Sequence, residues 1–542
     1  MTVDYLSSLN IGSGLNSTEI IDAIVEAERA PKASIIENSE TAKNLQISSL
    51  GLVKSDVESF QTNIALSQGV TGISVNNTGA SSSIVITDPG SISEFSNTLE
   101  ISQLATSHTL VFGDYSTQDF DIGQGTISFA FGTWDSDGDF TANADRTATV
   151  VTINSTNDTL SGLRDAINDA NIQISASIIE TSDSTYSLVL KSREGADHAI
   201  QMTVTEDSSD TGLSSFSYTS VSASTETIAA SDATLELDGV SITRDTNTIT
   251  DLIPGASLTL ASTTSSAETI SASYDTDLAL LALEAVIENF NTLQSSLTSL
   301  YSRGLDGAEA GGLAGDPLIR SMISQFRNYT TTAIEGFGDT SIYPTEFGVT
   351  TNQDGTLSVD EDTFTSMYES NPDAFASIVL SRVTTGSTLV SGSMTGDSYT
   401  AGTYAFAIDS DGDATLDSVD LTEYTDGSFV VTSGEAVGLQ IDVSNSGTDT
   451  NIYVGRSLLD ILSNYATGIL ASDGLLEEKL TDATEDLEEL TTDLTNLDAR
   501  IAKVRARYVE QFAAMNKTVA SLKETEKSLE NMMTAWTAAM KR

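Results

Sequence analysis

An apolar heptad repeat near the C-terminal end is the feature that most constrains this chain. Apolar residues recur in alternating steps of four and three. The pattern continues less regularly through Phe512, Met515, Val519, Leu522, Leu529, Met533, Trp536 and Met540. The regular part comprises Leu476, Leu480, Ala483, Leu487, Leu490, Leu494, Leu497, Ile501, Val504 and Tyr508. Such a repeat is typical of a coiled-coil helix. The sequence therefore predicts helix from residue 456 to the chain end, packed either on its own domain or on another copy.

A second amphipathic helix is predicted close to the N-terminus. Asn16 can cap it, and Glu19 can reach back in the spacing of a capping box. Pro31 is expected to end or kink this short helix, because proline lacks the amide hydrogen. A helical pattern resumes over residues 35–67. The first helix carries an apolar stripe of Ile20, Ile21, Ile24 and Val25.

The two apolar stripes are expected to meet, because an exposed stripe on a short helix forgoes its burial energy. The N-terminal stripe would pack on the C-terminal seam or on neighbouring copies of it. The predicted oligomer or filament contacts are Ile20, Ile21, Ile24, Val25, Leu487, Leu490, Leu494, Leu497, Ile501 and Val504.

Composition narrows the possible partners. The chain has 542 residues, 78 acidic against 24 basic, and a net charge of −54. Phosphates would be repelled, which argues against nucleic acid and anionic membrane surfaces. No cysteine is present, no apolar run could span a bilayer, and the start lacks a secretory signal pattern. We therefore expect no membrane insertion, and any exit from the cell must use another route.

The residue pattern between the helical ends predicts an α+β multidomain fold: a terminal helical coiled-coil stalk with inserted β-rich head domains. Short alternating runs joined by turn residues predict strands, and Asp316 with Pro317 predicts another helix start. The predicted segments are 1–68 (N-terminal helical stalk), 69–274 (β-rich head, with an insertion motif at about 158–200), 275–383 (helical domain), 384–455 (β-rich acidic insertion) and 456–542 (C-terminal coiled-coil helix).

Two copies of the motif DSDGD are weak candidates for calcium loops. In the second copy the spacing of a calcium loop is met by Asp409, Asp411, Asp413, Asp417 and Asp420. The glycine required at the sixth position is replaced by Ala414. Since Asp-Gly is also a common hairpin turn, we favour turns at both motifs and predict no metal site.

No sequence pattern indicates catalysis. His108 and His198 lie far apart in polar β texture, where surface or core positions are more common than ligand roles. The chain contains no P-loop, dinucleotide, nucleophile-elbow or zinc-protease motif. We expect a protein that is not an enzyme and that has no cofactor.

Several ordered blocks resemble one family. "IGSGLNSTEIIDAIVEAERAP" from Ile11, "DTLSGLRDAINDANIQISASIIETSDSTYSLVLKSREGADHAI" at 158–200, "LDGVSITRDTNTITDLIPGASLTL", "GGLAGDPLIRSMISQFRN" and "FGVTTNQDGTLSVDEDTFTSMYESNPDAFASIV" resemble the bacterial flagellar filament cap family, hook-associated protein 2. The block at 158–200 resembles the insertion motif of hook-associated proteins and flagellins. The resemblance runs to about Val379 and includes the C-terminal coiled coil; residues 384–455 depart from it.

The resemblance implies a structural cap at the distal tip of the flagellum. It implies a homo-oligomer, usually a pentamer, that promotes assembly of exported flagellin and prevents its loss to the medium. The implied partners are flagellin, the hook–filament junction protein and an export chaperone at the C-terminal helix. The implied route is the flagellar type III export apparatus. The alternative is an acidic extracellular adhesin or glycan-binding surface protein; flagellin and the junction protein are closer rivals.

Overall fold

The computed structural model describes residues 16–304, 309–396, 398–424, 427–444 and 449–540. These residues form two compact units. Unit 1 combines the chain up to Gln68 with Leu283–Phe364 and the chain from Val383 on. Unit 2 contains Gly69–Ala282 and Thr365–Arg382. Helices at both chain ends with β-rich segments between them confirm the α+β multidomain class. The five-segment division by sequence stays a prediction.

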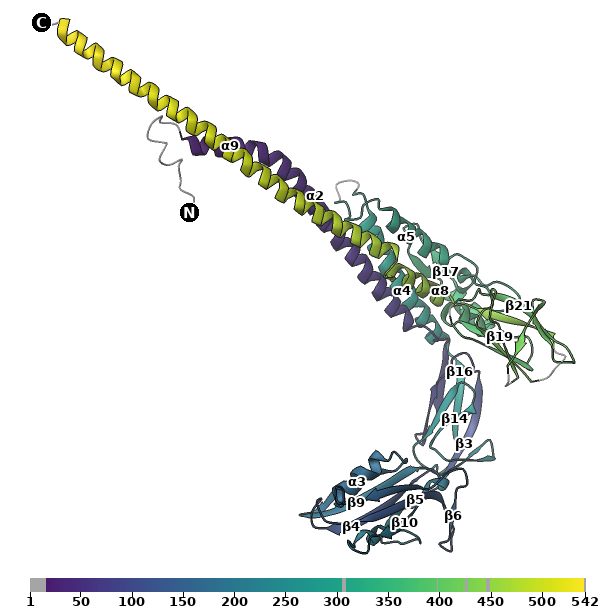
Figure 1. Ribbon diagram of the computed structural model, residues 1–542. Helices are drawn as coiled ribbons and strands as arrows, with labels where there is room; N and C mark the ends of the chain where they lie inside the picture. The colour runs from purple at the N-terminus through teal and green to yellow at the C-terminus, as the bar shows by residue number, and fades with distance from the viewer. Residues whose placement is uncertain (1–15, 305–308, 397, 425–426, 445–448, 541–542) are drawn as a thin grey trace. The chain divides into compact units, whose positions relative to one another are not determined.

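Helices dominate unit 1 (Figure 1). They are α2 (Ser17–Ala65), α4 (Thr276–Tyr301, in this unit from Leu283), α5 (Pro317–Tyr329), α6 (Glu361–Ser370, in this unit to Phe364), α8 (Leu458–Leu470) and α9 (Leu475–Met540). The longest of them are α2 and α9. Their starts follow the predicted capping chemistry. The Asn16 side chain accepts a hydrogen bond from the backbone N–H of Glu19, and Asp316 accepts from Leu318 N–H at 2.8 Å. The part of the N-terminal motif that precedes Asn16 lies outside the described residues.

Of the two effects expected of Pro31, an end or a kink of the helix, the end is wrong. α2 runs through Pro31 without interruption for 49 residues. An interior proline costs about 3 kcal/mol in an isolated helix. Here Ile21 and Val25 before it and Ala33 after it all pack on α9 in one apolar cluster, and this packing supports the helix on both sides of Pro31.

The expectation of continuous helix after Arg456 is also wrong. α8 ends at Leu470, and α9 begins at Leu475. Ala471 has an extended ψ of 142°, and the Gly474 amide donates to its carbonyl at 2.9 Å. The sequence Ala-Ser-Asp-Gly favours a turn over helix. α8 nevertheless continues along α2, because Gln61 on α2 donates to Thr467 on α8 at 2.6 Å.

The β-rich part of unit 1 consists of a short hairpin and two antiparallel sheets. The hairpin pairs β17 (Val349–Thr351) with β18 (Leu357–Val359). One sheet has the order β19-β27-β21-β22-β23 and the other β20-β26-β25-β24. These strands are β19 (Arg382–Thr385, in this unit from Val383), β20 (Val390–Met394), β21 (Gly402–Ile408), β22 (Ala414–Leu416), β23 (Val419–Asp420), β24 (Thr422–Glu423), β25 (Ser428–Val430), β26 (Leu439–Val443) and β27 (Asp449–Gly455). Phe406, Phe429 and Ile441 lie in their shared core.

Unit 2 contains two β cores. The first joins a five-stranded sheet, β1-β16-β3-β12-β13, to a three-stranded one, β14-β15-β2. The bounds are β1 (Ile73–Asn77), β2 (Ser82–Ile86), β3 (Phe95–Gln103), β12 (Ala233–Leu237), β13 (Val240–Arg244), β14 (Thr248–Ile253), β15 (Ala256–Leu260) and β16 (Glu268–Tyr274). Helix α7 (Ala376–Val379) also belongs to this unit.

The second core of unit 2 contains the predicted insertion motif. β5 pairs with β10, β6 and β7, and a four-stranded sheet has the order β11-β4-β9-β8. The bounds are β4 (Ser107–Tyr115), β5 (Gly125–Trp134), β6 (Phe140–Ala142), β7 (Thr149–Ile153), α3 (Leu160–Asp169), β8 (Ser175–Ser182), β9 (Thr185–Glu194), β10 (Ala199–Glu206) and β11 (Glu226–Ile228). The predicted helix face of Leu160, Leu163 and Ile167 is fully buried. The interpretation of this motif as domain core is therefore confirmed.

Both DSDGD motifs form hairpin turns. In the second, Asp409 Oδ1 accepts hydrogen bonds from the amides of Asp411 and Asp413, between β21 and β22. Asp135 does the same for Asp137 and Asp139 between β5 and β6. The glycine of each motif has a positive φ, 83° in the first and 92° in the second, which an L side chain rarely adopts. The predicted turns are confirmed.

Candidate assembly interface on the stalk helices

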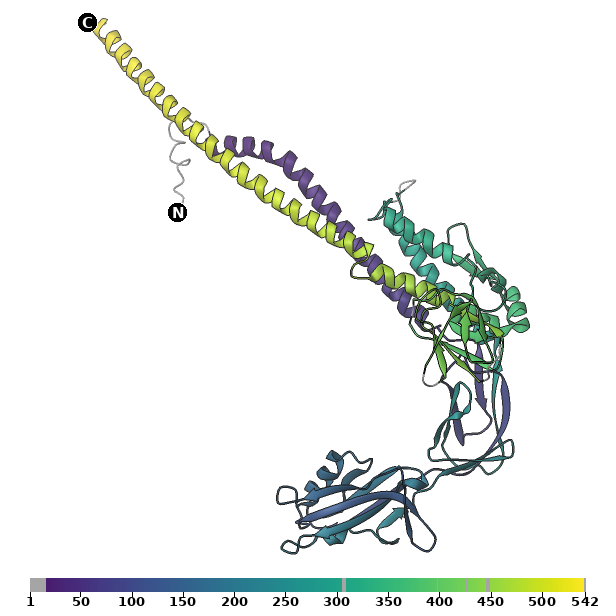
Figure 2. The same ribbon diagram turned by 45° about the vertical axis from the view of Figure 1, so that its right-hand side comes forward.

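The two stalk helices, α2 and α9, lie antiparallel and side by side (Figures 1 and 2). Asp22 pairs with Arg505 at 2.7 Å, and Arg29, seven residues later, pairs with Asp498, seven residues earlier, at 2.8 Å. The ion pairs Lys43–Asp486 and Lys54–Glu477 continue this alignment along the helices. The Asp498 carboxylate raises the pKa of the Arg29 guanidinium, first through their hydrogen bond and then through its charge. The ion pairs thus follow the helix pair continuously, although the aligned position on α9 shifts by two residues at Lys43 and by four at Lys54.

Four of the ten predicted contact residues meet in one apolar cluster. Ile21 and Val25 from α2 are buried with Leu497 and Ile501 from α9. Leu494 packs on this cluster half-buried. The N-terminal stripe was expected to pack on the C-terminal seam or on neighbouring copies of it. At Ile21 and Val25 it packs on the seam of the same chain. The other predicted contacts stay partly open: Ile20 is 37% exposed, and Ile24, Leu487, Leu490 and Val504 are half-buried.

A groove of about 400 Å³ opens between the stalk helices beside Leu490. Small or polar residues of α2 face this part of the seam, so no large apolar side chain fills it. The lining residues are Ser39, Ala42, Lys43, Gln46, Asp486, Glu489, Leu490 and Asp493. The groove thus has an apolar floor with an acidic rim, and it leaves Leu490 accessible to another surface.

The C-terminal part of α9 extends past the start of α2 (Figures 1 and 2). Beyond Asn516, the apolar stripe that the heptad pattern predicts lies open on the helix. Leu522, Leu529, Met533, Trp536 and Met540 are each more than half exposed. A row of large apolar side chains at helical spacing is typical of a surface that another helix covers.

Sequence reasoning missed the polar pair at the end of the stalk. Asn516 donates through Nδ2 to the Ser17 hydroxyl at 3.0 Å, and both residues are buried. The heptad pattern places Met515 in the seam, yet Met515 is 38% exposed. An asparagine next to a predicted seam position can mark a buried polar contact in a coiled coil, but a search for apolar residues alone does not find it.

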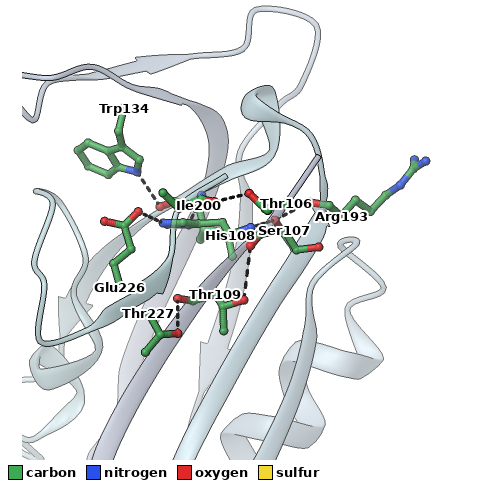
Figure 3. Close-up of polar contacts among 11 residues, drawn as sticks. Thr106, Ser107, His108, Thr109, Trp134, Arg193, Ile200, Glu226 and Thr227 are labelled. Carbon is green, nitrogen blue, oxygen red and sulfur yellow. Dashed lines mark hydrogen bonds and ion pairs between the residues drawn. The ribbon is translucent and has the colours of Figure 1, made fainter. Parts of the chain in front are cut away.

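The two histidines are core residues of unit 2. His108 on β4 accepts a hydrogen bond from the Ile200 amide at Nδ1, 2.9 Å, and its Nε2 lies 3.1 Å from the Glu226 carboxylate (Figure 3). The ring proton is therefore on Nε2, which donates to Glu226. Burial lowers the pKa of His108, although Glu226 opposes that shift.

His198 is held in a similar way. Its Nε2 lies 2.8 Å from Nη2 of Arg146, which can only donate, so the proton of the neutral ring is on Nδ1. Burial and then the Arg146 charge lower the pKa of His198. Of the surface or core positions expected for the two histidines, both occupy core positions.

The described residues contain neither a cluster of metal-ligating side chains nor a membrane-spanning helix. No three acidic or histidine side chains among them gather closely enough to hold a metal ion. Asp409 and Asp417 of the candidate calcium loop instead accept hydrogen bonds from backbone amides, Asp417 from Ala405 at 2.8 Å. In the same part of the chain, no helix is both long and apolar enough to cross a bilayer.

Comparison with known proteins identifies one family. The chain matches the family model of the flagellar hook-associated protein 2 N-terminus at residues 13–108 and that of its C-terminus at residues 230–524. The second match runs through residues 384–455, although this segment departs from the family pattern in the sequence.

Curated relatives carry the same description. Flagellar hook-associated protein 2 of Escherichia coli (strain K12) is 28% identical over 391 residues, covering 69% of this chain and 80% of that protein. The B-type flagellar hook-associated protein 2 of Pseudomonas aeruginosa is 25% identical over 381 residues, covering 66% and 77%.

The fold is also similar to a solved structure. The crystal structure of the D1-D2-D3 domains of the flagellar cap protein FliD from Escherichia coli superposes with a TM-score of 0.54 at 20% identity, covering 80% of this chain and 99% of that one. This likeness supports the fold, while the family models decide the membership. The chain belongs to the flagellar hook-associated protein 2 family, the family of the bacterial flagellar filament cap.

Proposed function

We propose that this chain is one subunit of a cap at the distal end of a bacterial flagellar filament, where it promotes ordered assembly of flagellin. Family membership supports the cap role. The observation that carries the proposal is the stalk: both chain ends contribute to one antiparallel helix pair, and α9 presents an open apolar stripe beyond it. Such a stripe suits a protein that docks on other helices of an assembly.

The occupant we propose for the stripe is a second copy of this chain. The stripe continues the seam that already holds α2, so a further α9 offers a matching heptad surface. The groove beside Leu490 adds a second open contact on the same helix pair. We propose a homo-oligomer, a pentamer by analogy with the family, in which these surfaces are covered.

The remaining partners follow from the cap role. We propose that the assembled cap contacts flagellin, that it first meets the hook–filament junction protein, and that an export chaperone covers the C-terminal helix before export. The route is the flagellar type III apparatus, and the working location is the extracellular flagellum tip. The role is structural rather than catalytic, since the histidines serve as buried hydrogen-bond partners in the core of unit 2.

A deletion strain tests the cap role. Without this protein, flagellin should still be made and exported, but it should escape into the medium and leave bare hooks. Purified protein added from outside should restore filaments, which electron microscopy can score. Full-length filaments on a deletion strain with no second copy of the gene would overturn the proposal. Normal filaments with reduced surface attachment would instead support the adhesin alternative.

Two neighbouring substitutions test the stripe. Leu529→Lys places a charge in the open apolar stripe, whereas Glu530→Lys places the same side chain at the next exposed position. The Glu530→Lys protein should restore filaments as well as the parent protein does, and the Leu529→Lys protein should not. Equal restoration by both proteins would remove the stripe from the proposal while leaving the cap role intact.

A further inference from the structure

The end of the stalk contains a polar pair inside an apolar seam. Asn516 is 2% exposed and Ser17 is 4% exposed, and they share one hydrogen bond of 3.0 Å. Among the described residues, no donor reaches Oδ1 of Asn516, although that atom is buried. A buried amide with an unsatisfied oxygen costs stability relative to leucine at the same position. The buried Asn516 side chain therefore needs an explanation other than the stability of the stalk.

The C-terminal part of α2 is aligned by its contact with α8, through Gln61 and Thr467, because only a four-residue turn joins α8 to α9. The apolar seam beside the part of α2 before Pro31 selects its register less strictly. The seam of α9 repeats apolar residues every seven positions. A slip of seven residues would replace Leu497 and Ile501 either by Leu490 and Leu494 or by Val504 and Tyr508.

The surface ion pairs do favour the observed register over a slipped one. One slip would place Arg29 beside Arg505, and the opposite slip would place Asp22 beside Asp498. These side chains are partly exposed, so salt weakens their contribution.

The pair of Asn516 and Ser17 also favours the observed register, and salt does not screen this preference because both side chains are buried and uncharged. In the first slip Asn516 would lie beside Ile24, and in the opposite slip Ser17 would lie beside Val509. Each slip leaves a buried polar group facing an apolar side chain without a partner. Losing a hydrogen bond in an apolar interface costs about tenfold in the population of that arrangement.

We propose that Asn516, through Ser17, is the register-determining residue for the part of the stalk in which α2 precedes Pro31. It aligns the start of α2 with a single position on α9 and holds that alignment where the surface ion pairs are screened. The inference concerns pairing within one chain and does not depend on the proposed cap role.

Cysteine cross-linking tests the register, since the chain contains no cysteine of its own. The pair Asp22→Cys with Arg505→Cys reports the observed register, and Arg29→Cys with Arg505→Cys reports the slipped one. Each cysteine pair is introduced into three versions of the full chain. These are the parent sequence, the Asn516→Leu variant, and the Met515→Leu variant as the matched control. A short bis-maleimide reagent is applied to dilute protein, and intramolecular products are quantified by mass spectrometry.

The decisive condition is about 1 M NaCl, where the Debye length is about 3 Å. With Asn516 or with Met515→Leu, only the observed-register pair should cross-link. With Asn516→Leu, the slipped pair should gain about tenfold, as expected for one lost hydrogen bond, while the thermal midpoint of the stalk rises. If Asn516→Leu cross-links only in the observed register at high salt, the proposal is wrong.

Ser17→Ala provides a second test if Asn516→Leu changes the overall fold, which far-UV circular dichroism would reveal. This variant removes only the hydroxyl that accepts from Asn516. It should also increase the slipped product at high salt, but it should lower the thermal midpoint, because the amide then has no partner. An unchanged cross-linking pattern would exclude Ser17 as the partner that gives Asn516 its selectivity.

Discussion

The Nδ1 atom of His108 accepts the amide hydrogen of Ile200 at 2.9 Å, so this buried ring cannot take up a second proton without losing that hydrogen bond. The folded pKa of His108 is lowered by burial, and so is that of His198. The unfolded chain therefore binds more protons than the folded one below about pH 6.5. The contribution of these two pKa shifts to the stability of unit 2 is fully present above that pH, and it is lost as the pH decreases toward the folded pKa values.

We predict that the free energy of unfolding of unit 2 falls between pH 7 and pH 5, by at most about 1.4 kcal/mol per pH unit for each histidine, and that the thermal midpoint falls with it. Trp134 donates to the Ile200 carbonyl at 3.3 Å and reports this region (Figure 3). Fluorescence of a Trp536→Phe variant, which retains only Trp134, follows the transition. The same variant with His108→Gln should show a smaller slope. An equal slope in both proteins would contradict the role of His108.

Two leucines of the same seam should respond differently to lysine. Leu497 is buried against α2, and its replacement by lysine should destabilise the stalk by at least about 2 kcal/mol. Leu490 is half-buried at the groove, so Leu490→Lys should leave the monomer folded and weaken self-association. Thermal unfolding and sedimentation velocity separate the two effects. Equal unfolding temperatures for the two variants would argue against the difference in burial as the cause.

Asp316 should make two separable contributions. One carboxylate oxygen caps α5, and the other forms an ion pair with Lys479 on α9. Asp316→Ala removes both contacts and should cost about 1–2 kcal/mol in the free energy of unfolding. Asp316→Asn keeps the cap and should cost less than about 1 kcal/mol. Urea unfolding followed by far-UV circular dichroism measures both. The idea of a cap contribution fails if the two variants are equally stable.

Calcium should leave the acidic hairpin unchanged. The Asp409 carboxylate already accepts two backbone amides, and Ala414 occupies the position where a calcium loop requires glycine. Millimolar calcium should therefore not shift the thermal midpoint of the full chain. A rise of several degrees that Asp409→Ala and Asp411→Ala abolish would show that the loop binds the ion.

Local chemistry was readable from the sequence where neighbouring residues decide the structure. The caps at Asn16 and Asp316 formed as expected, because an N-cap side chain needs only backbone amides two or three residues ahead. The DSDGD turns formed for the same reason. The face of Leu160, Leu163 and Ile167 was predictable because helical spacing alone brings these side chains together.

The sequence by itself therefore determined the kinds of element and their order, including helices at both ends and a heptad seam in α9. Tertiary structure alone decided that α2 continues through Pro31, that the chain turns between α8 and α9, and that Asn516 rather than Met515 lies in the interface. Periodicity states which residues share a face. It does not state which face another helix covers, because that depends on contacts between residues almost 500 positions apart.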